Sequence, residues 1–134
     1  MSGPALVSIL RQDAYLIASV HTALADSEML RFQQDLIEQI GRHRSRGVII
    51  DVAALDVLDS FAQSTLENIA EMARLRGAAT VIVSIRPDVA FEMVQLGMGT
   101  RTVPTALDLE EGLAYLNSRM RRTGADVGRG GLHP

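Results

Sequence analysis

The 134-residue chain contains neither cysteine nor lysine. Without cysteine, disulfide bonds and thiol chemistry are excluded. All 13 positive side chains are arginines, which excludes Schiff-base catalysis and a P-loop lysine, and argues against a phospho-accepting receiver domain built on Asp51. The net charge of −3 gives no electrostatic reason to expect a nucleic-acid or anionic-membrane partner.

Long apolar runs are missing as well. No segment approaches the roughly 18 apolar residues of a membrane span, and the N-terminus lacks the basic patch and apolar core of a secretion signal. The sequence therefore predicts a cytoplasmic protein. Its 47% hydrophobic and 22% charged residues are near globular averages, and the length suits one domain rather than two.

Catalytic and metal-binding motifs are also absent. No G-x-S-x-G turn surrounds Ser60, and no motif links His21, His43 or His133 to that serine. There is no H-x-x-x-H pair or acidic calcium loop, so we predict neither a metal nor a cofactor. The residues 97–99 are Gly-Met-Gly but lack the lysine of a phosphate loop. A binding or regulatory protein is favoured over an enzyme.

The apolar residues alternate between strand-like and helix-like patterns. Residues 5–10 and 14–20, separated by the polar residues 11–13, are typical of an antiparallel pair. Residues 48–52 and 80–85 are rich in valine and isoleucine, as in strands buried on both faces of a parallel sheet. A short edge strand is expected around residues 101–103.

Four helices are expected between and after these strands. They are predicted to begin at an Asp26 cap, at Ser60, at Pro87 and at Asp108, and the first three to end near residues 41–47, Gly77 and Gly97. The resulting order, β-β-α-β-α-β-α-β-α, predicts an α/β fold with a mixed, mostly parallel sheet and crossover helices. Residues 1–121 would form this one domain. Residues 122–134, with four glycines, are predicted to be a disordered tail.

A serine follows the strand at residues 48–52 and a short acidic turn. Ser60 starts an S-x-x-Q capping box, in which its hydroxyl would accept a backbone N–H. Alternatively, Asp59 is the cap and Ser60 the first helical residue. The chemistry alone favours a capping serine, but it leaves open phosphorylation, which would add about −1.5 to −2 charges beside Asp56 and Asp59.

Several separated motifs resemble the STAS domains of the anti-sigma-factor antagonist family. Residues 55–61, Leu-Asp-Val-Leu-Asp-Ser-Phe, resemble the phosphorylatable loop of that family. Further matches lie, in the same order as in the family, at residues 32–36, 47–51, 85–90, 96–98 and 105–113. The resemblance is strongest to small stressosome scaffold proteins of the RsbS type and extends to about Arg121. It implies a STAS fold with Ser60 as the phosphate acceptor.

This resemblance also implies a role and partners. The chain would be a non-catalytic stressosome scaffold that sequesters a serine kinase of the RsbT type and releases it when Ser60 is phosphorylated. It would self-associate and assemble with RsbR-type co-antagonists, and an RsbX-type phosphatase is a further expected partner. The absence of a sensory domain before the STAS-like unit favours the small scaffold over the larger co-antagonist.

Two departures from the family pattern bear on this role. Residues 59–62 read Asp-Ser-Phe-Ala, where downstream antagonists usually have Asp-Ser-Ser-Gly or Asp-Ser-Thr-Gly, so an anti-sigma-factor antagonist is the second interpretation. Val83-Ser84 stands where related scaffolds often carry Thr-Gly, so a second acceptor at Ser84 has little support. A serine hydrolase using Ser60 lacks a base, and a nucleotide-binding regulatory domain lacks a phosphate loop.

The predicted partner-binding surface combines the acidic turn, the helix after it and the turn after the next strand. Parallel strands place their carboxyl ends on one edge of a sheet, where partners commonly dock. Phe61 is either a core residue or a contact anchor on this surface. The surface residues are Asp56, Asp59, Ser60, Phe61, Gln63, Ser64, Arg86, Pro87 and Asp88.

Overall fold

The computed structural model describes residues 5–95 and 103–132, with side chains described as far as Arg121. Its elements are β1 Val7–Gln12, β2 Tyr15–Val20, α1 Asp26–His43, β3 Gly47–Asp51, α2 Ser60–Leu75, β4 Ala79–Val83, α3 Pro87–Gln95, β5 Thr105–Ala106 and α4 Leu109–Leu132. This order confirms the predicted one. Within the described ranges, no helix has the combined length and hydropathy needed to cross a bilayer.

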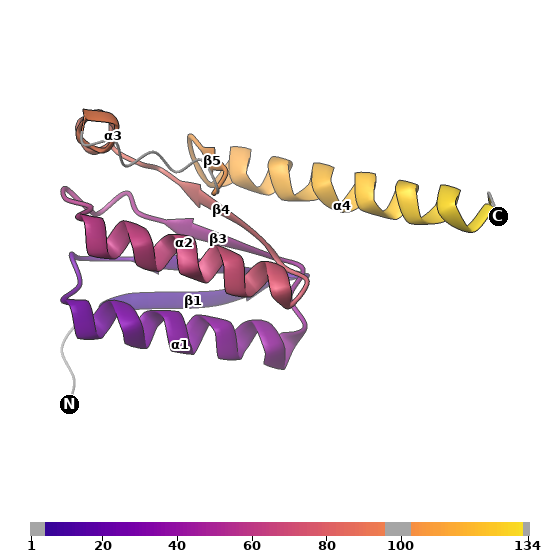
Figure 1. The fold of residues 1–134 in the computed structure, drawn as a ribbon, viewed down its shortest axis with the longest axis horizontal. Coiled ribbons are helices and arrows are strands. Elements are labelled where there is room, and N and C mark those ends of the chain that lie inside the picture. Colours follow the sequence, from indigo (N-terminus) through magenta and orange to yellow (C-terminus); the bar gives the residue numbers. More distant parts are fainter. Residues whose placement is uncertain (1–4, 96–102, 133–134) are drawn as a thin grey trace.

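The five strands form one mixed sheet in the order β1-β2-β3-β4-β5 (Figure 1). Strand β1 is antiparallel to β2, and the remaining pairs are parallel, with Ile17 opposite Ile49 and Ile49 opposite Val81. Strands β3 and β4 are central and buried on both faces, which explains their continuous apolar sequences. The carboxyl ends of β2 to β5 meet at one edge of the sheet.

Helices cover the two faces of the sheet unequally. On one face, α1 and α2 pack through residues such as Phe32, Leu36 and Ile69 against Ile50 and Ile82. On the opposite face, the described part of the chain supplies helix α4, whose Leu116 packs on Ile49, Val81 and Val83. Figure 1 shows α1 and α2 side by side, while α4 lies on the other side and extends beyond the sheet.

The first hairpin turn comprises residues 13–14, whereas residues 11–13 were predicted. Gln12 pairs with Tyr15, which leaves a two-residue loop of Asp13 and Ala14. Asp13 has a φ of 54°, a left-handed conformation that aspartate tolerates better than most residues and that tight hairpins require. The polar residues Arg11 and Gln12 therefore belong to the strand rather than to the turn.

The edge strand also differs from its predicted position. It comprises Thr105 and Ala106, whereas residues 101–103 were predicted; Arg101 and Thr102 lie outside the described residues, and Val103 precedes the strand. Pro104 has no N–H to donate, but its carbonyl oxygen accepts from the Ile82 N–H at 3.0 Å. Hydrogen bonding to β4 therefore begins at the proline carbonyl, and the strand itself follows at Thr105.

Most predicted helix ends agree with the structure, including the start of α2 at Ser60 and the end of α1 at His43. Asp108 caps α4, since its carboxylate accepts from the Glu111 N–H at 2.9 Å. Gly77 follows α2 with a φ of 85°, and Pro87 starts α3; the predicted end of α3 at Gly97 lies outside the described residues. Asp26, however, is the first residue of α1, not its cap. There, the Glu28 carboxylate accepts from the Ala25 N–H at 2.7 Å and so gives this backbone donor at the helix start a hydrogen-bond partner.

The backbone of α4 is helical to Leu132, where a disordered tail had been predicted from residue 122 onwards. The four glycines of this segment each weaken a helix by about 1 kcal/mol relative to alanine. Among the residues whose side chains are described, Met120 is the last of α4 that packs against the core. The domain boundary at residue 121 and a disordered tail in solution stay predictions.

Helix α4 approaches the sheet very closely at Gly112. A Cβ atom on this residue would lie 2.7 Å from Cγ1 of Val83 and 3.6 Å from Cγ1 of Val81, and both valines are fully buried. Five residues further along α4, the Tyr15 hydroxyl donates to Oδ1 of Asn117 at 2.6 Å, and burial raises the pKa of this tyrosine. Packing and a hydrogen bond thus both hold α4 to its face.

Candidate functional site

The loop that joins β3 to α2 is held at both ends. At its start, the Asp51 carboxylate accepts from the Ala53 N–H at 2.9 Å, which closes a tight turn. Further on, the side chains of Leu55 and Leu58 are buried in the core. Asp56, between them, is exposed. The loop therefore has a fixed path on the sheet while it presents acidic groups to solvent.

Asp59, not Ser60, caps helix α2. The Asp59 backbone is extended, with φ −74° and ψ 175°, and its carboxylate accepts from the Ala62 N–H at 2.8 Å. Its carbonyl oxygen accepts the first intrahelical bond, from the Gln63 N–H at 2.9 Å. The capping-box interpretation of Ser60 is therefore wrong. Aspartate and serine cap about equally well, so the sequence alone did not separate the two candidates.

Ser60 is the first residue of α2, and its side chain is exposed. Within the described part of the chain, its hydroxyl makes no hydrogen bond that would compete with modification. The first N–H groups of a helix have no intrahelical partner, and the helix dipole is positive there, so the helix end itself attracts a phosphate. The carboxylates of Asp56 and Asp59 oppose that attraction.

The residues of α2 in the predicted surface fall on different sides of the helix. Ser64, one turn after Ser60, is exposed. Phe61 is half-buried and packs against the core, which supports its interpretation as a core residue. Gln63 is only 3% exposed and does not lie on the surface, contrary to the prediction. It stands three residues before the buried Leu66, on the same helical face.

The second predicted segment lies after β4. Arg86, Pro87 and Asp88 are all exposed, and Nε of Arg86 is 3.5 Å from Oδ1 of Asp88. Because β3 and β4 are parallel neighbours, this turn shares the carboxyl edge of the sheet with the Ser60 loop. Among the described residues, no hydrogen bond or ion pair joins the two segments. The edge thus presents two separate groups of polar side chains.

Sequence reasoning missed one apolar residue of this edge. Val57 is 53% exposed and lies in the loop immediately before Leu58 and the Asp59 cap. An exposed valine beside Ser60 places an apolar group next to the charged groups of the loop, a combination that is usual at protein interfaces. The signal in the sequence was weak, because Val57 stands between a buried and an exposed position without a periodic pattern.

The histidines considered as a base for Ser60 have other positions. A ring nitrogen of His21 lies 2.7 Å from the Ser8 hydroxyl, so its partner is a different serine. His43 ends α1, at the edge of the sheet opposite the Ser60 loop. His133 lies outside the described residues.

Ser84, directly after β4, adopts a left-handed backbone with φ 66°. This conformation costs an ordinary residue about 1 kcal/mol or more, whereas glycine adopts it freely. The strain accounts for the glycine that the family resemblance places at this position.

Ser84→Gly is therefore expected to raise the free energy of unfolding by about 0.5–1 kcal/mol. Urea unfolding monitored by circular dichroism measures this change. Ser118→Gly, in the regular helix α4, is the control and should be destabilising by a similar amount. A destabilised Ser84→Gly variant would contradict the strain argument.

Residues 8–112 match the STAS domain family. The chain belongs to this family. Among curated proteins, it is similar to the RsbT co-antagonist protein RsbRA of Bacillus subtilis (strain 168), with 31% identity over 83 residues. That match covers 62% of this chain and 30% of RsbRA, so the chain spans less than a third of that relative.

Two solved structures of STAS proteins are similar to this chain in sequence as well as in fold. Moorella thermoacetica RsbS, in a variant with a serine replaced by glutamate, is 32% identical, with a TM-score of 0.75 over 87% of this chain and 99% of that chain. A chain from a structure of the stressosome, described as a signal integration and transduction hub, is 30% identical, with a TM-score of 0.68 over 85% and 99%. This STAS protein is thus homologous to stressosome components.

Proposed function

We propose that this STAS domain is a non-catalytic stressosome scaffold that holds an RsbT-type serine kinase and releases it when Ser60 is phosphorylated. The observation that carries the proposal is the position of Ser60: an exposed hydroxyl at the first turn of α2, beside a helix cap made by Asp59. The similarity to RsbS and to RsbRA supports the same role.

The switch would act by changing the charge of a docking surface. An added phosphate carries about −1.5 to −2 charges and meets the carboxylates of Asp56 and Asp59 on the same exposed loop. A kinase seated on this edge must then desolvate a strongly anionic surface, which weakens the complex. The Asp59 cap bonds to the backbone independently of Ser60, so the domain stays folded when the kinase leaves.

The proposed partners follow from the relatives. They are other copies of this chain, RsbR-type co-antagonists in a large cytoplasmic assembly, and an RsbX-type phosphatase that removes the phosphate from Ser60. RsbRA is itself described as an RsbT co-antagonist, which supports both the co-assembly and the kinase. The polar groups of the Arg86 turn would extend the kinase-binding surface along the same edge.

The proposal is tested by incubating the protein with ATP and a purified RsbT-type kinase, followed by intact-mass and peptide mass spectrometry. We expect one phosphate, located on Ser60, and none on Ser60→Ala. The matched control is Ser64→Ala, which removes an exposed hydroxyl one turn along α2 and should leave the modification unchanged. Phosphate on another residue, or kinase binding without modification, would overturn the switch.

Light scattering of the same samples separates the scaffold from the anti-sigma-factor antagonist. A scaffold mixed with an RsbR-type protein should form a particle of megadalton scale. An antagonist should instead form a small, stable complex with its kinase. A serine hydrolase would show turnover of ester substrates that Ser60→Ala abolishes without unfolding.

A further inference from the structure

A hollow lies at the edge of the sheet opposite Ser60. It encloses about 380 Å³ at the amino ends of β3 and β4, between the end of α2 and the face of α4. Since β4 has five residues and a strand rises about 3.3 Å per residue, roughly 16 Å of sheet separates this edge from the Ser60 loop. A ligand here would not touch the proposed phosphorylation site.

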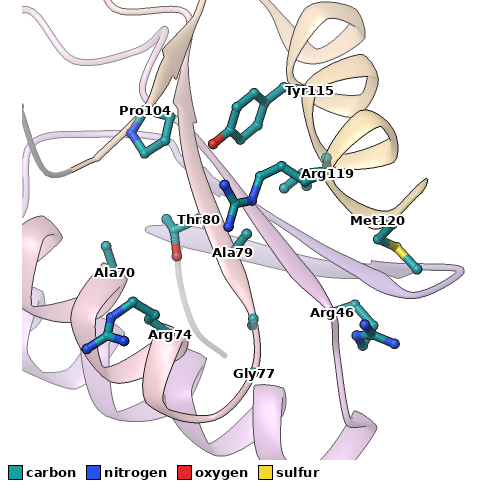
Figure 2. A pocket seen from close by; sticks show the side chains of 12 residues that line it. Arg46, Ala70, Arg74, Gly77, Ala79, Thr80, Pro104, Tyr115, Arg119 and Met120 are labelled. Atoms are coloured by element: carbon teal, nitrogen blue, oxygen red, sulfur yellow. The ribbon is translucent and has the colours of Figure 1, made fainter. Parts of the chain in front are cut away.

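Three arginines from three separate elements line this hollow. Arg46 precedes β3, Arg74 comes from the last turn of α2, and Arg119 comes from α4. Figure 2 shows Arg119 reaching from α4 towards β4, with Arg74 and Arg46 on either side of the Gly77 turn. Although the protein has a net charge of −3, three arginines line this one hollow and make its surroundings locally positive.

The arginines are not equally available to a ligand. Arg74 is paired with Glu71, with an N–O distance of 2.5 Å. Within the described part of the chain, Arg46 and Arg119 form no ion pair. Arg119 lies over the Tyr115 ring, 5.9 Å from its centroid, which limits the conformations of its side chain. The site therefore offers about two unneutralised positive charges, one of them partly oriented.

Thr80 supplies an independent sign of a missing partner. Its side chain lines the hollow, is only 5% exposed and has a hydroxyl oxygen without a hydrogen-bond partner among the described residues. Figure 2 shows this hydroxyl directed towards the side where Arg74 lies. A buried hydroxyl without a partner costs about 1–3 kcal/mol, and a bound acceptor would remove that cost.

The strand edge beside Thr80 is open as well. Strand β5 pairs only with Ile82 and Val83 of β4, and the Ile82 N–H points to that side, where it reaches Pro104. The Thr80 N–H, two residues earlier, points the same way and has no strand partner among the described residues. A second donor is thus available next to the hydroxyl.

We propose that this hollow binds a small phosphorylated molecule. Arginine forks and N–H or O–H donors match phosphate oxygens, and two unneutralised charges suit a dianion. The remaining lining is largely apolar and gives a place for the carbon body of the ligand: Ala70, Ala78, Pro104, Tyr115, Leu116 and Met120. The volume lies in the range of about 300–1,000 Å³ that is usual for small-molecule sites.

The proposal is tested by titrating the full chain, labelled with ¹⁵N, with glucose 6-phosphate, pyrophosphate or citrate. Saturable amide shifts are expected at Arg46, Gly77 and Thr80 with the two phosphate compounds, and at least fivefold weaker binding is expected with citrate. Arg46→Gln combined with Arg119→Gln should abolish the shifts. Arg42→Gln, which removes an exposed arginine of α1 paired with Glu38, is the matched control and should bind normally.

Thr80→Val separates an effect on ligand binding from an effect on stability, because the two are expected to change in opposite directions. Because it removes a buried hydroxyl without a partner, it should raise the melting temperature while weakening phosphate binding several-fold. Absence of saturable shifts with all three probes, or equal loss in Arg42→Gln, would overturn the proposal. Tight citrate binding would replace phosphate with a carboxylate ligand. None of these outcomes depends on Ser60.

Discussion

Ser60→Glu is expected to weaken the complex with an RsbT-type kinase at least tenfold, which corresponds to about 1.4 kcal/mol. The substitution places a permanent carboxylate at the exposed first turn of α2, beside Asp56 and Asp59. The kinase surface complementary to the unmodified loop then faces an extra negative charge. The fold should be retained, because a carboxylate is favourable at a helix N-terminus by about 0.3–1 kcal/mol.

Surface plasmon resonance of the kinase on immobilised variants measures this effect, with circular dichroism to verify folding. The matched control is Asn68→Glu, which adds the same charge to an exposed position of α2, about 12 Å further along the helix. It should change the affinity less than twofold. Equal weakening by both substitutions would mean that net charge, rather than the Ser60 position, governs kinase binding.

Gly112→Val is expected to lower the free energy of unfolding by about 1–3 kcal/mol, the usual cost of overfilling a packed core. A Cβ atom alone would already lie 2.7 Å from Cγ1 of Val83, and that strand is buried between helices and cannot retreat. Helix α4 would have to shift away from the sheet. Such a shift would also strain the hydrogen bond between Tyr15 and Asn117.

Helix propensity alone predicts the opposite order of stability for this variant and its control. By propensity, Gly112→Val should stabilise α4 by a few tenths of a kcal/mol, whereas Ala114→Val at an exposed position of the same helix should cost about 0.6 kcal/mol. Close packing predicts that the Gly112 variant is the less stable of the two. Chemical denaturation of both proteins decides the matter, and a Gly112 variant as stable as the parent would refute the close approach.

The sequence was most informative where one pattern dominated. The valine- and isoleucine-rich strands β3 and β4 and the helix start at Pro87 were predictable, because burial on both faces and a proline at the first turn leave distinct signatures. Strand β5 was misplaced because two residues are too few for a periodic signal. The cap of α1 was misassigned because Glu28 satisfies the helix start from within the helix.

The two candidate sites differ in how much of each could be predicted from the sequence. The Ser60 loop is contiguous in sequence, so its acidic residues could be recognised together. The burial of Gln63 could not be predicted without knowing which face of α2 packs on the core. The arginine-lined hollow is assembled from residues as distant as Arg46 and Arg119. Only the parallel order of the strands, together with the packing of α4, brings them to one edge.

The single-helix cover of one sheet face has a consequence for synthesis on the ribosome. Strands β1 to β4 are complete in the chain before α4 is made, because synthesis runs from the N-terminus at about 5–20 residues per second. Until α4 arrives, the row formed by Ile49, Val81 and Val83 is open to solvent or to a neighbouring nascent chain. The apolar face is thus covered only when α4 docks.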